Sequence, residues 1–342
     1  MKPTIKMIAK KAGVSRGTID RVLHNRPNVN SEKRQKVLDI LKEMDYAPNF
    51  AARALALKVK DIKIAALLPN WTGYFKEEVL RGIEDATQEL RNYNIDILLE
   101  RCKTEQPQEC IKKIDALIAK GIRGIAICAK DTISIQKKLF SIVQAGIPVV
   151  TFNSDISHSG RLCFVGMDLI KEGRIGAELM SKILPAKGRT LIVCGNLEFY
   201  AHKSRVQGFC DRFQELGRQP NTYTVVETNN EHETTRQRVS EYLAGKEDIK
   251  GIYMANESVA GCVEAIKQSH IAKKIPLVCH DASSSHIDFL REGIVDFVIE
   301  QNMYRQGLEP LKMIADLLIE GKRPEKDIDY SRIHIVCAEN ID

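Results

Sequence analysis

The stretch AGVSRGTIDRVLHNRPNV, Ala12 to Val29, concentrates side chains that can form hydrogen bonds with a nucleic acid. They are Ser15, Arg16, Thr18, Arg21, His24, Asn25 and Arg26. The arginine guanidinium matches the O6 and N7 acceptors of guanine, and short polar side chains suit phosphate oxygens. Two interpretations compete: a solvated amphipathic helix, or a helix that lies in a groove of DNA.

The uneven distribution of charge favours the second interpretation. Residues 1–60 carry 14 lysines and arginines against 5 aspartates and glutamates, whereas the remaining residues carry 37 against 40. A basic head of +9 joined to a body of −3 indicates a polyanionic partner. An acidic membrane surface is the alternative, but the head lacks the aromatic, strongly amphipathic helix that favours membrane docking.

Length and composition limit the remaining possibilities. A chain of 342 residues, 44% hydrophobic and 28% charged, is expected to form two or three globular domains. The sequence has neither the apolar run of a signal peptide nor about 18 consecutive apolar residues, so we expect a cytoplasmic protein. The nine cysteines are scattered without a CxxC pair, and we expect them to be reduced, with no metal and no cofactor.

Three helices are predicted within residues 1–48. Capping side chains at Thr4, Ser15 and either Asn30 or Ser31 mark three helix starts. The apolar positions after these starts recur at helical spacing, and the expected buried faces are Ile5, Ile8, Ala9 and Ala12; Ile19, Val22 and Leu23; and Val37, Leu38, Leu41 and Met44. Three short helices with one shared core make a helix-turn-helix domain.

Residues 49–60 predict a short helix of a different kind. Pro48 and Asn49 end one helix and can begin another that reaches Leu57. This helix has almost nothing to pack against and is too short to be stable alone in water. We expect it to fold only on a partner.

From Asp61 onward, near-continuous apolar runs alternate with helical stretches, as in parallel sheets covered on both faces. The runs are 62–69, 95–100, 122–129 and 147–153, followed by 189–195, 223–229, 251–256, 275–281 and 295–302. Two such series predict two doubly wound lobes with a cleft between them. Ligands of such sheets gather at the carboxyl ends of strands, where Asn153, Asn256, Asp281 and Gln301 fall.

These features together resemble the LacI/GalR family of bacterial transcription regulators over essentially the whole chain. The head matches in TIKMIAKKAGVSRGTIDRVLHN, VNSEKRQKVLDILKEMDYAPN and the segment with Ala52 and Leu55. The body is similar to the ribose-binding-protein type of periplasmic sugar-binding fold in GIPVVTFNSD, FVGMD, SRVQGF, MANE, HD at 280–281 and EQN at 300–302. The resemblance implies an α + α/β protein that binds palindromic operator DNA as a homodimer.

The resemblance also implies the domain boundaries. Residues 1–48 would be the three-helix DNA-binding domain, 49–60 the hinge helix and linker, and 61–342 the two-lobed effector-binding and dimerisation domain of the periplasmic-binding-protein type. The N-lobe would comprise about 61–162 and 303–327, and the C-lobe about 163–302 and 328–342. The tail carries no leucine heptads, which favours a dimer over a tetramer built by a coiled coil.

On DNA, the resemblance places the second helix of each head in a major groove and two hinge helices in the minor groove, with Leu55 as an apolar wedge. Arg16, Gly17 and Arg21 fall where the family contacts base edges, and Asp20 could accept from cytosine N4 or hold Arg21. The expected DNA-binding residues are Thr4, Ser15, Arg16, Gly17, Thr18, Asp20, Arg21, Asn25, Ser31, Asn49, Ala52 and Leu55. For the capping residues among them, a purely structural role is the alternative.

In the body, the resemblance assigns the ligand to residues at the cleft. The expected ligand-binding residues are Trp71, Tyr74, Phe75, Asn153, Ser154, Asp168, Phe199, His202, Arg205, Asn256, Asp281 and Gln301. Strand-end caps, hinge ion pairs and core packing are the alternatives. The stretch NSD at 153–155 stands where ribose binders carry an acidic–arginine pair, and Leu169 stands where they often carry an asparagine after the aspartate, here Asp168. Ribose itself is therefore not expected, and a polyol, inositol or other sugar stays open.

We therefore expect a ligand-controlled transcription regulator, a repressor of a carbohydrate-utilisation operon, whose effector is either an inducer or a co-repressor. An exported solute-binding protein would need a signal sequence and would lack the basic head. An enzyme is disfavoured because the sequence has no HExxH or P-loop motif and its eight histidines are dispersed. A nucleoid protein is the third alternative, and it would bind DNA without sequence preference.

Overall fold

The computed structural model describes residues 5–23, 29–44, 62–71, 73–103, 106–185, 188–197, 200–245, 248–269 and 274–341. Two compact units divide the chain, Met1–Val59 and Lys60–Asp342. The predictions for Thr4, Asn25, Asn49, Ala52, Leu55 and Phe199, and the predicted hinge segment 49–60, lie outside the described residues, as does the side chain of Asp20. Within the described part of the chain, no helix is both long and apolar enough to cross a bilayer.

The first unit is a three-helix domain, as predicted. Its helices are α1 (Ile5–Ala12), α2 (Arg16–Leu23) and α3 (Ser31–Glu43). Ile8, Ile19 and Val37 are fully buried where the three helices meet. The prediction for Leu38 is wrong: its side chain is 43% exposed, and Ile40 is buried instead, one helical turn after Val37.

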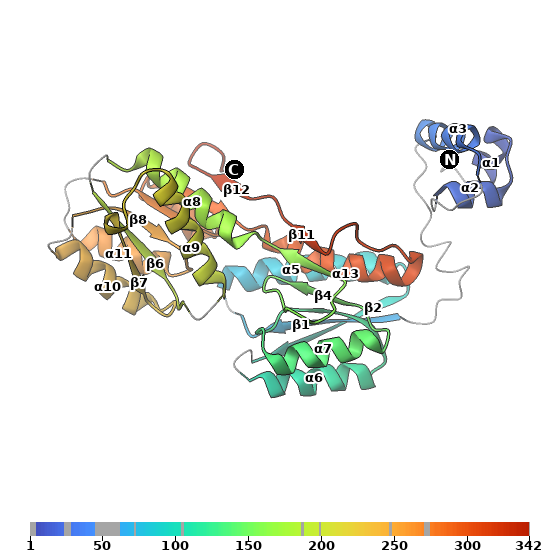
Figure 1. Ribbon diagram of the computed structural model, residues 1–342, viewed down its shortest axis with the longest axis horizontal. Coiled ribbons are helices and arrows are strands. Elements are labelled where there is room, and N and C mark those ends of the chain that lie inside the picture. Colours follow the sequence, from blue (N-terminus) through green and yellow to red (C-terminus); the bar gives the residue numbers. More distant parts are fainter. Residues whose placement is uncertain are drawn as a thin grey trace. The chain divides into compact units, whose positions relative to one another are not determined.

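The second unit begins with a parallel sheet. Its strands are β1 (Ile62–Pro69), β2 (Ile95–Cys102), β3 (Ile122–Ile127), β4 (Val149–Phe152), β5 (Cys163–Gly166) and β11 (Ile328–Tyr330), in the order β11-β5-β4-β3-β1-β2. The covering helices are α5 (Gly73–Arg91), α6 (Pro107–Ala119), α7 (Ile133–Gln144) and α13 (Met303–Glu320). Figure 1 shows α6 and α7 side by side on one face of this sheet, with α5 and α13 on the other.

A second sheet repeats this arrangement. Its strands are β6 (Arg189–Cys194), β7 (Tyr223–Glu227), β8 (Ile249–Met254), β9 (Leu277–His280), β10 (Phe297–Glu300) and β12 (His334–Val336), in the order β12-β10-β9-β8-β6-β7, with only β12 antiparallel to its neighbour. Its helices are α8 (Leu169–Ile183), α9 (Tyr200–Glu215), α10 (His232–Ala244), α11 (Val259–Gln268) and α12 (Ser284–Arg291), with the short 3₁₀ helix η1 (Pro220–Thr222) before β7. Separate apolar cores lie on its two faces, one with α8 and α9 and the other with α10, α11 and α12.

The strand pairing moves two of the expected lobe boundaries. β5 and β11, which we expected in the C-lobe, pair with each other in the first sheet, where Phe164 stands opposite Ile328. β5 also pairs with β4, so the chain reaches the second sheet only at α8. After β10 the chain returns to the first sheet for α13 and β11, and it then passes back to the second sheet for β12. Backbone hydrogen bonds thus show that β5 and β11 belong to the first sheet, which hydropathy alone does not reveal.

The cysteines differ from the expectation at one place. Cys102, the last residue of β2, and Cys110, in the first turns of α6, form a disulfide with their Cα atoms 5.4 Å apart. Both are buried because α6 begins directly beside the end of β2. The prediction that all nine cysteines are reduced is therefore wrong for this pair, and the other seven are free thiols.

Close helix packing on the first sheet depends on two glycines. A methyl group on Gly82 of α5 would overlap the carbonyl oxygen of Tyr304 in α13, and one on Gly307 would overlap the carbonyl oxygen of Val79. Backbone lies against backbone at both contacts, so neither side can rotate away. These two glycines set the approach of α5 and α13.

Gly307→Ala should lower the free energy of unfolding of the full chain by ~1–3 kcal/mol, because the added methyl group forces the two helices apart. Urea denaturation followed by circular dichroism measures the change. Glu77→Ala, on the exposed side of α5, is the matched control. Equal stabilities of the two variants would contradict this account of the packing.

Candidate functional site

In the first unit, α2 presents an exposed polar face. Ser15 caps it: its Oγ accepts from the backbone nitrogen of Thr18 at 3.1 Å and lies 3.0 Å from the Thr18 hydroxyl oxygen. Arg16, Gly17 and Arg21 are exposed on the side away from buried Ile19 and Val22. The following helix, α3, begins at exposed Ser31, while the Asn30 side chain accepts from Glu32 N at 2.8 Å.

In the second unit, a polar cluster lies at the carboxyl ends of the strands of the second sheet. Asn256 follows β8, Asp281 follows β9 and Gln301 follows β10. Parallel strands bring these three ends to one edge of the sheet. Each side chain is at most 5% exposed, although all three are polar. Buried polar groups need partners, so their hydrogen bonds define what the cluster can do.

The centre of this cluster is an ion pair between Arg205 and Glu172. Arg205 Nε in α9 donates to Glu172 Oε2 in α8 at 2.8 Å, and Arg205 Nη1 donates to the Ala255 carbonyl at 3.3 Å. Arg205 is 5% exposed and Glu172 is fully buried. Burial raises the pKa of Glu172 to about 7, although the adjacent guanidinium opposes the shift. Two ionisable groups are thus buried together where α8 contacts α9.

Asp281 lies within electrostatic range of this pair. Its Oδ1 accepts from Gln301 Nε2 at 2.6 Å, and its backbone adopts a left-handed conformation with φ of 67°. Burial raises the pKa of Asp281, while the charge of Arg205 and the Gln301 hydrogen bond oppose the rise. The ring of His286, in α12, places Nδ1 2.5 Å from the Asp281 carbonyl oxygen. Asp281 is therefore held at two points, its carboxylate by Gln301 and its backbone carbonyl by His286.

Asn256 is held on one side only. Its Nδ2 donates to the Thr228 hydroxyl at 3.2 Å, and its Oδ1 has no hydrogen-bond partner among the described residues. His202, in α9, places Nδ1 within 3.1 Å of the Asn196 backbone nitrogen, and burial, followed by the charge of Arg205, lowers its pKa to about 4. Its ring is therefore neutral at pH 7.

Residues at the carboxyl end of β1 form an aromatic group. The ring of Trp71 stands edge-on to Phe75 at a centroid distance of 4.4 Å, and to Phe152 at 6.3 Å. Both Trp71 and Phe75 remain partly exposed. Tyr74 lies within electrostatic range of the second sheet. Burial raises its pKa to about 12, and the negative charges of Glu78, Glu300 and Asp281 add to the rise.

Asn153 and Ser154 follow β4 in a loop held by a neighbouring polar cluster. Asn153 has a φ of 61°, and its Nδ2 donates to Gln306 Oε1 at 3.3 Å. Gln306 Nε2 in turn donates to the Gln301 carbonyl at 3.1 Å, so one side chain connects the strand ends of the two sheets. Ser154 is partly exposed and donates its backbone N–H to the Phe152 carbonyl at 2.7 Å.

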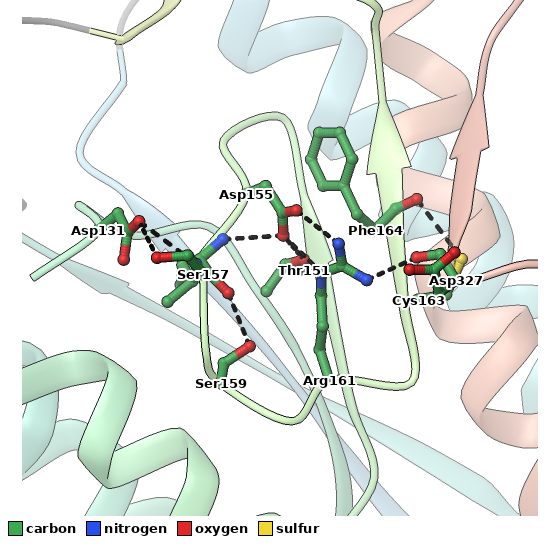
Figure 2. Close-up of polar contacts among 10 residues, drawn as sticks. Asp131, Thr151, Asp155, Ser157, Ser159, Arg161, Cys163, Phe164 and Asp327 are labelled. Carbon is green, nitrogen blue, oxygen red and sulfur yellow. Dashed lines mark hydrogen bonds and ion pairs between the residues drawn. The ribbon is translucent and has the colours of Figure 1, made fainter. Parts of the chain in front are cut away.

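Figure 2 shows what fixes the rest of that loop. Arg161 binds Asp155 through two hydrogen bonds of 2.6 Å, and Thr151 donates to the same carboxylate at 2.8 Å. Arg161 Nη1 also reaches the Asp327 carbonyl at 2.5 Å, which attaches the loop to the segment before β11. Ser157 donates to Asp131 at 2.8 Å on the other side. The loop is thus held at both ends.

The structure therefore separates the predicted ligand residues into groups. One group lies together at the edge of the second sheet and consists of Arg205, Asn256, Asp281 and Gln301. Tyr74 is close enough to this group that the charge of Asp281 contributes to its raised pKa. Asp168 acts as a helix cap, accepting from Lys171 N at 3.0 Å at the start of α8. Trp71 packs against Phe75 and against the buried ring of Phe152, so this pair lies in an aromatic group of its own.

Sequence reasoning missed Glu172 and His280, both fully buried beside Arg205. Tyr253 OH lies 2.7 Å from His280 Nε2, and His280 Nδ1 lies 3.9 Å from Glu172 Oε2. His280 stands directly before Asp281 and could have been found by its position. Glu172 gives no such signal, because a glutamate early in an amphipathic helix is usually solvated.

Comparison with known proteins places this site in a class. A periplasmic binding protein domain matches residues 64–323, and the bacterial regulatory proteins of the lacI family match residues 4–49. A solute-binding protein from Burkholderia graminis, solved with D-arabinose, superposes with a TM-score of 0.72 at 22% identity over 82% of this chain and 96% of that one. The body is thus a two-sheet binding-protein fold and the head a regulator's DNA-binding region.

Relatives along most of the chain agree with both assignments. The transcriptional regulator DegA of Bacillus subtilis is 30% identical over 247 residues, 71% of this chain and 70% of its own. The ribose operon repressor of Haemophilus influenzae is 25% identical over 279 residues, 78% of this chain and 77% of its own. This chain belongs to the lacI family of bacterial regulatory proteins, and it is a DNA-binding transcription regulator.

Glu172→Ala should lower the free energy of unfolding by ~3–5 kcal/mol, because it leaves the buried Arg205 guanidinium without its counterion. Urea denaturation of the full chain measures the loss. Asp288→Ala removes an exposed partner of Arg291 and should change stability little, because solvent screens that pair. A loss no larger than that of the control would contradict the assigned role of the Glu172–Arg205 pair.

Proposed function

We propose that this regulator represses a carbohydrate-utilisation operon and responds to a small sugar or polyol that binds between the two lobes. The observation that carries the proposal is the polar cluster of Arg205, Asn256, Asp281 and Gln301 at the strand ends of a binding-protein fold. Convergent donors and acceptors of this kind suit vicinal hydroxyls, each of which both donates and accepts. A relative that is itself a ribose operon repressor supports the carbohydrate class.

On DNA, we propose that the chain works as a homodimer in the cytoplasm. Exposed Arg16 and Arg21 would contact base edges in a major groove, and the capping hydroxyl of Ser15 would lie near phosphate. Segment 49–60 would fold as a hinge helix in the minor groove, with Leu55 as the wedge. Sensor and DNA-binding region stand in one chain, which fits regulation without catalysis.

Control would follow from the two-lobed body. A ligand shifts the balance between open and closed lobes only by its differential affinity for them. Closure would alter the spacing of two paired hinge segments and thereby operator affinity. An inducer lowers that affinity and a co-repressor raises it.

Selection of duplexes from a random DNA pool, followed by a thermal-shift screen of sugars and polyols, tests the proposal. A palindromic consensus and at least one compound that raises the melting temperature are expected, because ligands that bind the native state stabilise it. Equal retention of all duplexes would indicate a nucleoid protein, and turnover of a bound compound would indicate an enzyme.

Arg16→Ala should relax discrimination at one base pair of each half-site by ~1–3 kcal/mol, because it removes a bidentate contact to guanine. Competition binding against single-base variants of the selected palindrome measures this. Lys33→Ala, an exposed residue of α3, is the control and should not change the base preference. A loss that is uniform across all sequences would contradict the base-contacting role of Arg16.

Asp281→Asn should abolish the melting-temperature rise caused by ligand while operator affinity without ligand stays unchanged. Asparagine tolerates the left-handed backbone of this position, so the substitution removes the charge and keeps the shape. Asp288→Asn, at an exposed position of α12, serves as the control. A ligand response retained by Asp281→Asn would exclude Asp281 from the binding site.

A further inference from the structure

Negative charge exceeds positive charge around the cluster at the ends of β8, β9 and β10. Among the described residues of the cluster, Arg205 supplies the guanidinium, and that group already binds Glu172 and the Ala255 carbonyl. Asp281 adds a second carboxylate and Asp168 a third, both of which act on Glu172. The charge of Arg205 is therefore balanced inside the protein before any ligand arrives.

The two nearby histidines do not restore the balance. Burial lowers the pKa of His280 well below its ordinary range, and the charge of Arg205 adds to the effect. His202 has its pKa lowered to about 4 for the same two reasons. Both rings are neutral at pH 7.

Glu257 adds a further carboxyl group shortly after the end of β8. The side chain is exposed, yet enough protein surrounds it that its pKa rises to about 7, with the charge of Asp281 as the next cause. Within the described part of the chain, neither Glu257 nor Asp281 forms an ion pair with a lysine or arginine. Two carboxyl groups without a directly paired lysine or arginine thus stand at adjacent strand ends, and Arg205 acts on both from a distance.

The first sheet faces the same field with a phenol. Tyr74 lies within range of Asp281 and of Glu300, the last residue of β10. His334 of β12 stands opposite Glu300 in the strand pairing and is exposed. Tyr74 can donate its hydroxyl hydrogen or accept, but it brings no positive charge.

The hydrogen-bond account points the same way. The amide donors of this edge are partly committed: Asn256 Nδ2 donates to Thr228, and Gln301 Nε2 donates to Asp281. The buried atoms without a partner among the described residues include two acceptors here, Asn256 Oδ1 and Glu172 Oε1. Asn256 is only 2% exposed, so an unmet acceptor there is costly unless a ligand or water supplies a donor.

We propose that the effector of this site is a polyol or sugar that carries a protonated amine. The inference rests on the proposed function, namely a polyol-type effector at the strand ends. An ammonium group supplies a hydrogen-bond donor for Asn256 Oδ1. It also supplies a positive charge opposite the carboxyl groups of Glu257 and Asp281. Sugar acids and sugar phosphates would add a further anion to this edge and are disfavoured.

A thermal-shift and calorimetric screen of the full chain tests the charge class directly. The probes are D-glucosamine, D-galactosamine and D-mannosamine, each beside its neutral parent hexose, its N-acetyl form and the corresponding uronate, together with neutral pentoses and polyols. At least one amine is expected to bind about tenfold or more tightly than its neutral parent, and its N-acetyl form should lose that advantage.

Three outcomes separate the claims. Tighter binding of an amine supports the inference. Binding of a neutral or anionic compound at least as tight as that of its aminated analogue overturns the inference and leaves the proposed function standing. Binding of no compound in the panel, whatever its charge, overturns the proposed function together with the inference.

Glu257→Gln sharpens the test because it removes an ionisable carboxyl group from an exposed side chain and keeps its shape. The variant should lose about tenfold in affinity for the amine and little for the neutral parent. Glu339→Gln is the control: it is exposed and lies beyond β12, which runs antiparallel to β10 and so leads away from the strand ends. Equal losses for amine and neutral parent would contradict the role of Glu257, and a ligand-free melting temperature confirms folding.

Discussion

The body of this regulator depends on one buried ion pair, that of Glu172 with Arg205. Two charges in the interior are tolerated only when each satisfies the other, and here the contact also joins α8 to α9. Glycines make that approach possible: a methyl group at Gly173 would overlap the Arg205 carbonyl oxygen. The pair fixes the guanidinium against the end of β8, and the remaining polar groups are arranged around it.

The Glu172–Arg205 pair also determines the charge balance at the strand ends of the second sheet. With its charge balanced by Glu172, Arg205 orders Ala255 and influences Asp281 without leaving the protein an excess of positive charge. The first sheet approaches through Tyr74 and through Gln306, which bonds to both Asn153 and the Gln301 carbonyl. Because these hydrogen bonds connect the strand ends of the two sheets, a change at this edge can be transmitted from one lobe to the other.

The sequence was a good guide where a pattern repeats. Alternating apolar runs predicted the strands, and Ser15 marked the start of α2. Long-range pairing was harder: short strands such as β5 and β11 belong to a sheet by hydrogen bonds to distant partners. Glu172 was missed for a related reason, since its partner Arg205 stands 33 residues further along the chain. The Cys102–Cys110 disulfide is local, with a separation of 8 residues, and was missed because the spacing of the cysteines does not show that α6 begins beside the end of β2. The DNA-contacting and ligand-contacting roles remain predictions.

The central claim is that a ligand bound in the body changes the affinity of the head for DNA. The most direct measurement is the dissociation constant of the selected operator without ligand and with saturating ligand, together with that of the ligand without and with operator. Linkage requires both constants to change by the same factor, about fivefold or more for a working switch. Operator affinity that stays unchanged while the ligand is bound would contradict the account.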